Sequence, residues 1–484
     1  MLGMYVHMHW GYRHPYAART WTLADWEGYL EGLAALGYDF VMIWPLLDSM
    51  PPQPTADDRA FLQQVGQAID LAHRRFGMRV AIVVCPNTIG NETSSHYAFA
   101  DRPYFVCEKK VDPKDPAAVA ALLAGRRNQL ASLKEADALA IIDSDPGGFI
   151  GSTNDEFVDL VHGQIEVFRE LNPSAELIYW MLFGWENYNR FWAESQAWQA
   201  GEPPPRIERR TEVYAETLDR IQARIPEPWS LFACFPEHVG VISQMGLEGK
   251  TIAFPYGLVE GEPTFPLTNL DVGRLATAFR GEVMQVGHRG KMANAQTHCL
   301  QLPHTYLFAR GGTAASADLA AFARQLLPGA GEAVARAWRA IGTGTPQAQR
   351  AAAQTLREEV GRSGGEGALS GLLFGDGERF LVDLAMNLEL RAALADLGVA
   401  IDADRGARAA LRGVLDRLQP YQQRIGFVDA YGGPLAETLN QPLARLHEPR
   451  IDAVLAQFHD WRDPSIRNGL LLRLLEVLDE FAVS

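Results

Sequence analysis

Short apolar runs alternate with longer amphipathic segments along the first two thirds of the chain. The runs have the length of strands, whereas the longer segments carry apolar residues at helical spacing. Cap residues support this division, because Thr22 is placed to begin the first helix and Gly37 to end it. The apolar runs predict eight strands, which lie within residues 5–10, 38–46, 79–85, 138–148, 176–183, 229–235, 250–256 and 282–286.

Alternation of strands and helices on this scale predicts a (β/α)8 TIM barrel over residues 1–312. A doubly wound open sheet is the competing fold, but no glycine-rich turn follows the first strand, where a dinucleotide fingerprint would lie. After Gly312 the chain becomes rich in Ala, Leu and Arg, which predicts an all-α accessory domain over residues 313–484. Its last segment, GLLLRLLEVLDEF, is apolar enough to dock on a neighbour, so this domain could carry a homodimer contact.

Composition narrows the class of protein. The formal net charge of -15 argues against nucleic-acid binding, which needs a basic surface. The sequence begins with no signal-peptide pattern and has no apolar run of about 18 residues, so we expect a cytoplasmic protein without a membrane partner. The four cysteines form no CxxC pair, and we expect reduced core thiols, no metal and no cofactor.

The stretch ALAIIDSDPGG, residues 138–148, holds the main chemical signal. Strand side chains alternate, so Asp143 and Asp145 point the same way and lie ~6.5 Å apart. Burying a carboxylate costs free energy, and a pair of them at the end of a core strand therefore suggests a catalytic role. The simpler interpretation is that Asp143 accepts hydrogen bonds from the following turn.

Other polar and aromatic residues follow the remaining strands. In a (β/α)8 barrel, ligands bind at the carboxyl ends of the strands. Aromatic rings stack on sugar rings, and carboxylates and amides bind hydroxyls, so this composition suits a carbohydrate, although tryptophan is more often simply core. The predicted substrate-binding residues are His7, Trp10, Arg13, Trp44, Asn87, Trp185, Tyr256, Glu260, Glu262, His288, Asn294 and Gln296.

Glycoside hydrolysis needs a carboxylic acid that protonates the leaving oxygen and a second carboxylate that attacks or activates water. The candidates are Asp143 with Asp145, or Asp145 with Glu186, which could also be only a helix-start carboxylate. We expect Asp145 or Glu186 as the acid and Asp143 as the base or a substrate-positioning group. His9 could support the base, and His7 could bind hydroxyls.

The type of sugar stays open in the sequence. Arg13 or Arg289 could bind the carboxylate of an acidic sugar, whereas Asn294 and Gln296 could hold an N-acetyl group.

A metal-dependent hydrolase is the alternative. His7-Met8-His9 resembles the HxH that opens amidohydrolase barrels and binds metal there. The later strands end in DSD, GWEN and GHRGK, and only His238 fits that pattern loosely. A sugar-binding barrel without catalysis is a third possibility.

The succession of YVHMHWG, IIDSDPGG, LIYWMLFGWE, FPYGLVEGEP and NAQTHCLQLPHTY resembles the barrels of bacterial glycoside hydrolases, including groups distantly related to hexosaminidase-like and sialidase-like enzymes. The chain lacks the strand-four Asp-Glu of hexosaminidases, the DxxDxDxE of chitinases and the strand-four Asn-Glu of the large retaining clan. The resemblance therefore implies glycosidase activity without assigning the acid and the nucleophile. The matching positions are His9, Asp143, Asp145, Glu186, Glu260 and Asn294.

Overall fold

The computed structural model divides the chain into two compact units. The barrel unit consists of residues 1–9, 37–256 and 278–294, and the helical unit of residues 10–36, 257–277 and 295–484. The structure describes residues 1–9, 13–102, 107–199, 202–203, 205–255, 270, 272–295, 298–312, 316–362, 365–403, 405–425, 443, 445–458, 476–477 and 480.

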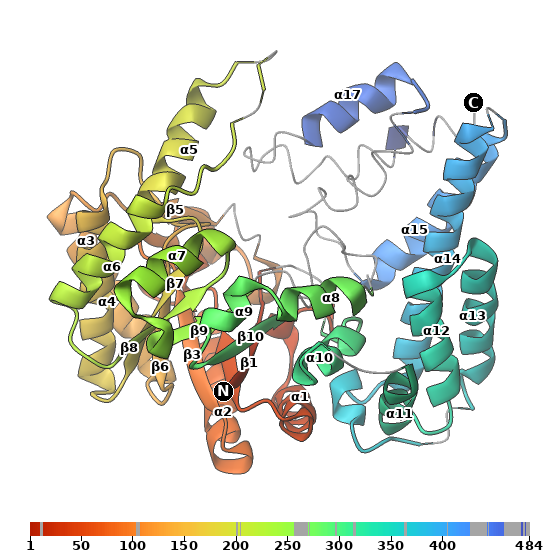
Figure 1. Cartoon of the computed structure of the whole chain (residues 1–484), viewed down its shortest axis with the longest axis horizontal. Coiled ribbons are helices and arrows are strands. Elements are labelled where there is room, and N and C mark those ends of the chain that lie inside the picture. The colour runs from red at the N-terminus through yellow and green to blue at the C-terminus, as the bar shows by residue number, and fades with distance from the viewer. Residues whose placement is uncertain are drawn as a thin grey trace. The chain divides into compact units, whose positions relative to one another are not determined.

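Parallel strands close into a barrel, which confirms the predicted (β/α)8 fold (Figure 1). Strands β3 and β6 are apolar along almost their whole length, as parallel strands covered on both faces require. Around the barrel the order is β1 (Leu2–Val6), β2 (Phe40–Ile43), β3 (Arg79–Val84), β6 (Ala138–Ile142), β7 (Glu176–Met181), β8 (Trp229–Ala233), β9 (Thr251–Ala253) and β10 (Gly290–Ala295).

The eighth strand lies later than predicted. Residues Glu282–Val286 form helix α9, and the strand is β10, which begins at Gly290. A five-residue apolar window cannot distinguish a strand from a helical turn, because both bury such residues. Between α9 and β10, the turn at Gly287 packs so closely that an added Cβ would lie 2.6 Å from the Ala253 backbone nitrogen.

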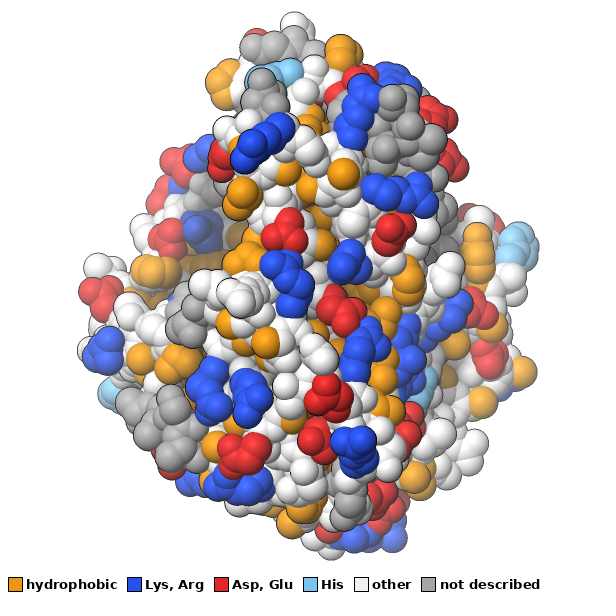
Figure 2. All heavy atoms as spheres, turned by 90° about the vertical axis from the view of Figure 1, so that its right-hand side faces the viewer, with side chains coloured by type: hydrophobic (Ala, Val, Ile, Leu, Met, Phe, Trp, Pro, Cys, Tyr) orange, Lys and Arg blue, Asp and Glu red, His pale blue; other side chains and the backbone are white. Residues whose placement is uncertain are grey.

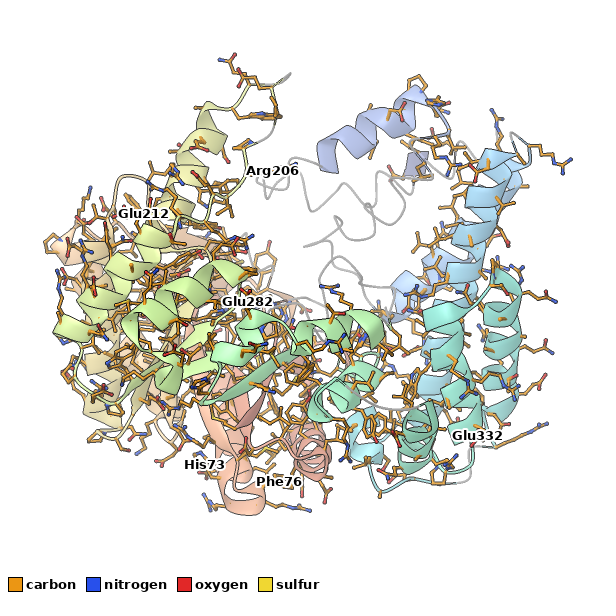
Figure 3. The ribbon with its side chains drawn as sticks, in the orientation of Figure 1. His73, Phe76, Arg206, Glu212, Glu282 and Glu332 are labelled. Carbon is orange, nitrogen blue, oxygen red and sulfur yellow. The ribbon has the colours of Figure 1, made fainter. Side chains whose placement is uncertain are left out.

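Helices follow the strands, and the caps predicted for the first helix are present: Thr22 Oγ1 accepts from the Asp25 N–H over 3.2 Å, and Gly37 has a φ of 95°. Helix α2 begins with a capping box of Thr55 and Asp58 and ends at Gly77, whose φ is 62°. Figure 3 labels His73 near this end of α2 and places Arg206, which precedes α6, at the opposite end of the barrel unit. The helices are α1 (Leu23–Leu36), α2 (Ala56–Phe76), α3 (Pro116–Leu130), α4 (Asn154–Leu171), α5 (Trp185–Ala197), α6 (Thr211–Arg224), α7 (Pro236–Met245), α8 (Val272–Phe279), α9 and α10 (Leu302–Ala309).

The long segment after β3 contains a small antiparallel ribbon of β4 (Thr88–Gly90) and β5 (Glu108–Lys110). Its Gly90 nitrogen donates to the Met50 carbonyl oxygen over 2.8 Å. A Cβ at Gly90 would meet the Met50 carbonyl carbon at 2.4 Å, so only glycine allows this contact. The ribbon is therefore fixed to the segment that follows β2.

The described part of the chain after Gly312 is helical, as predicted. Helices α13, α14 and α15 run side by side (Figure 1). Arg350 of α13 pairs with Asp396 of α14 over 2.7 Å. Figure 2 shows acidic and basic side chains interspersed on one face of the molecule, without a patch of one sign. The helices are α11 (Ser316–Leu326), α12 (Gly331–Thr343), α13 (Pro346–Glu359), α14 (Gly377–Asp402), α15 (Ala407–Ile425) and α17 (Pro449–Phe458).

A buried carboxylate joins distant segments of the helical unit. Asp383 of α14 accepts hydrogen bonds from the Tyr16 hydroxyl and the Arg424 guanidinium. Burial raises the pKa of Asp383, and these donors oppose that rise.

No helix among the described residues has the length and apolarity to cross a membrane.

At the amino ends of the strands, one acidic side chain binds two arginines. Glu176, the first residue of β7, accepts from Arg79 of β3 over 2.9 Å and from Arg289, just before β10, over 2.7 Å. Glu176 is 3% exposed, whereas its partners are more open. This clamp ties three parts of the barrel together at the end opposite to the expected site.

We expect Glu176→Gln to lower the free energy of unfolding by about 2 kcal/mol, because both arginines lose their charged partner. The matched control is Asp70→Asn, which breaks the exposed Arg74–Asp70 pair and should cost less than about 0.5 kcal/mol. Urea unfolding measures both. Equal midpoints for the two variants would show that the clamp does not stabilise the barrel.

Candidate active site

Aromatic side chains fill the barrel interior below the carboxyl ends of the strands. The Tyr5 ring contacts Trp180 edge to face at 5.4 Å and Phe254 at 6.0 Å. Trp44 joins this cluster and donates its indole N–H to Asp48 over 2.7 Å. Trp44 is 3% exposed, which favours a packing role over that of a sugar platform.

His7 and His9 lie together above this aromatic layer. Their Nδ1 atoms are 3.3 Å apart, and the His9 backbone N–H donates to His7 Nδ1 over the same distance. The His9 ring also meets the Trp44 ring edge to face at 4.3 Å. Both histidines are nearly buried, and the predicted pair is thus brought together at the end of β1.

Asp143 is enclosed at the end of β6. Its oxygens accept from the Ser144 hydroxyl over 2.7 Å, from the Tyr179 hydroxyl over 2.9 Å and from the Leu182 N–H over 3.2 Å. Burial raises the pKa of the Asp143 carboxyl to about 6, although these hydrogen bonds lower it. With no exposed area, Asp143 has the geometry of a buried acceptor that joins β6 to β7.

Asp145 is more open than Asp143. It is partly exposed, and its backbone is in the left-handed region with φ of 44°. The Tyr188 hydroxyl donates to Asp145 Oδ1 over 3.3 Å. Burial and then the charge of Asp145 raise the pKa of Tyr188, so this hydroxyl stays a donor.

Two residues that the sequence did not single out complete the surroundings of Asp145. The Lys110 ammonium lies 5.6 Å from the centre of the Tyr188 ring and 5.3 Å from that of Trp192. Lys110 also interacts electrostatically with Asp145 and Glu108. The sequence pattern does not single out Lys110, because only strand alternation in the ribbon assigns its side chain to the same side as Glu108.

Glu186 and Trp185 are directed toward α4. Glu186 Oε1 accepts from the backbone N–H of Asn154, the first residue of α4, over 2.8 Å. A carboxylate there satisfies a free helix N–H and complements the helix dipole. Trp185 is fully buried, donates to Ser152 over 2.8 Å and stacks on Phe157. These contacts give both residues structural tasks.

The predicted position of His288 at a strand's carboxyl end is wrong. Because β10 begins at Gly290, His288 precedes the strand and lies at the amino ends, next to Arg289 and its partner Glu176. Arg289 therefore cannot bind a substrate carboxylate at the other end. The error follows from the misplaced eighth strand.

The remaining candidates are scattered or undetermined. Asn87 and Asn294 are fully buried at the ends of β3 and β10. Arg13 is exposed in the helical unit, where its backbone N–H donates to Ile425 over 2.9 Å. The candidates outside the described residues are Trp10, Tyr256, Glu260, Glu262 and Gln296.

Metal ligation has limited support in the described part of the chain. There, no group of three or more His, Cys, Asp or Glu side chains could hold an ion. His238 is fully engaged, because its Nδ1 accepts from the Cys234 N–H over 3.1 Å and its Nε2 lies 3.2 Å from the Leu182 oxygen. Burial lowers the pKa of His238 to about 3, so the ring is neutral.

Comparisons with known proteins give remote similarity only. No protein-family model and no curated protein matches the sequence. The chain is similar to a GH138 enzyme targeting pectin rhamnogalacturonan II, with a TM-score of 0.49, 8% identity and coverage of 96% of this chain and 68% of that one. It is also similar to a mutant O-GlcNAc hydrolase from Thermobaculum terrenum, with a TM-score of 0.41, 12% identity and coverage of 99% and 93%. Both are glycoside hydrolases, the class that the sequence resembles.

We expect Asp143 to make stability depend on pH. The folded state holds the Asp143 proton more tightly than the unfolded chain, so its contribution is full below about pH 4 and is lost as the pH rises through about 6. Relative to Asp143→Asn, the wild type should lose about 3 kcal/mol of stability between about pH 4 and pH 7. Urea unfolding across this range measures the difference, and a difference independent of pH would contradict the assignment.

Proposed function

We propose that the protein is a glycoside hydrolase whose reactive carboxylate is Asp145. The observation that carries this proposal is the contrast at the end of β6. Asp143 is fully enclosed by donors, whereas the next carboxylate, Asp145, is partly exposed at the barrel's carboxyl end and touches the hydroxyl of Tyr188. Active sites of this fold lie at that end.

The neighbourhood of Asp145 suits a carbohydrate. The partly exposed Trp192 and Phe183 contact Tyr188, with ring centres 5.8 Å and 6.1 Å from it. Aromatic surface binds the apolar face of a sugar, while Asp145 can act on the glycosidic carbon or on water. The buried Asp143 then acts as a positioning group for the end of β6, and we retain the predictions that His7 binds hydroxyls and that His9 supports the base.

The helical unit supplies none of these groups. We retain three predictions from the sequence as part of the proposal: the domain division at Gly312, a cytoplasmic location and a homodimer contact through the helices after Gly312.

We expect purified protein to hydrolyse one or more members of a panel of aryl glycosides, and Asp145→Asn to lower kcat/KM by about 10²- to 10⁴-fold. Asparagine keeps the shape and the left-handed backbone, so the fold should persist. The matched control is Glu186→Gln, which should stay within a few-fold of wild type because Glu186 caps α4. Loss of activity in Glu186→Gln alone would contradict the assignment of Asp145.

Metal removal tests the competing function. We expect hydrolysis to survive incubation with EDTA, since Asp145 needs no metal to act. Loss of activity on chelation, with recovery on addition of zinc, would favour the metal-dependent hydrolase built on His7 and His9. Sugar binding without any turnover would favour the inactive barrel.

A further inference from the structure

The β4–β5 ribbon carries two adjacent lysines with different surroundings. Successive side chains of a strand point to opposite sides, so Lys109 and Lys110 of β5 face apart. Lys109 lies 3.4 Å from Glu92, and both are exposed. Lys110 instead reaches over the rings of Tyr188 and Trp192, which come from α5.

A buried amide fixes Lys110 relative to the loop of Asp145. The Asn87 side-chain NH₂ donates to the Val111 oxygen over 2.9 Å and to the Gly148 oxygen over 3.1 Å. The Val111 backbone N–H returns a hydrogen bond to Asn87 over 2.7 Å. One side chain thus ties the end of β5 to the loop that follows β6.

Polar and charged groups near Asp145 come from the ribbon and from α5. The ribbon contributes the ammonium of Lys110 and the carboxylate of Glu108, and α5 contributes the hydroxyl of Tyr188. The Cys85 thiol at the end of β3 also faces Lys110. Lys110 supplies the cation of this group: its ammonium lies over the two aromatic rings and interacts electrostatically with Asp145.

We propose that Lys110 is a positioning residue that keeps Asp145 in its ionised form. An adjacent cation favours a carboxylate over a carboxylic acid, and the aromatic rings hold that cation in place. The inference rests on the proposed function in giving Asp145 a catalytic task. It implies that Asp145 acts as a base, as a nucleophile or by stabilising positive charge, and does not donate the proton to the leaving group.

The test compares Lys110→Met with Lys110→Arg and with Lys109→Met. Removing the cation should move the acidic limb of the pH profile of kcat/KM upward by about 0.5 to 1 pH unit, a modest shift because Lys110 is solvent-accessible. Lys110→Arg should restore the wild-type limb. Lys109→Met should leave the limb unchanged, because its partner is Glu92.

A second measurement does not depend on activity. Carboxyl ¹³C NMR of aspartate-labelled protein, assigned with Asp145→Asn, follows the titration of Asp145 directly, and its midpoint should rise in Lys110→Met alone. If Lys110→Met does not fold, Lys110→Gln takes its place. An Asp145 midpoint equal in wild type and Lys110→Met, or an equal rise in Lys109→Met, would overturn the inference. A shifted midpoint in a protein that hydrolyses no glycoside would overturn the proposed function and leave the role of Lys110 standing.

Discussion

The buried ion pair of Asp48 and Arg126 is the constraint on which this end of the barrel depends. The Arg126 guanidinium, 1% exposed, binds Asp48 over 2.9 Å, the Cys85 oxygen over 3.2 Å and the Thr88 oxygen over 2.6 Å. A buried guanidinium cannot lose its proton, so each contact is needed, and loss of one partner of such a pair typically costs about 3–5 kcal/mol. Through these bonds α3 fixes the ends of β2 and β3 and the start of the ribbon.

Hydrogen bonding distinguishes Asp143 and Glu186 from Asp145. Asp143 and Glu186 have their oxygens bound to backbone N–H groups, which fix strand ends and helix starts. Asp145 accepts a hydrogen bond from the Tyr188 hydroxyl and interacts electrostatically with Lys110 on the neighbouring ribbon. Asp143 and Glu186 therefore hold the backbone around the more open Asp145. This arrangement suits one reactive carboxylate better than two equivalent ones.

The sequence predicts the barrel because parallel strands covered on both faces must be apolar, and β6 and all of β3 after Arg79 show this. It does not predict β10, where GKMANA lacks such a run, and the apolar EVMQV upstream forms a helix. Asp145 can be found from its place after a strand, but Lys110 cannot, because the rings of Tyr188 and Trp192 that it lies over are 78 and 82 positions away in the chain and only the folded ribbon brings it to them. The task of Glu186 depends likewise on the start of α4, a contact that spacing does not encode.

The left-handed backbone at Asp145 limits which residues can occupy this position. A φ of 44° disfavours most side chains, and Asp, Asn and Gly tolerate it best. A longer acid such as glutamate would strain the loop, so the carboxylate cannot be exchanged for one of greater reach. Few substitutions are therefore tolerated at position 145, and replacement by asparagine is one that keeps the loop and removes the charge. Homologues that have lost the reaction would then be recognisable by an intact loop with an amide in place of the acid.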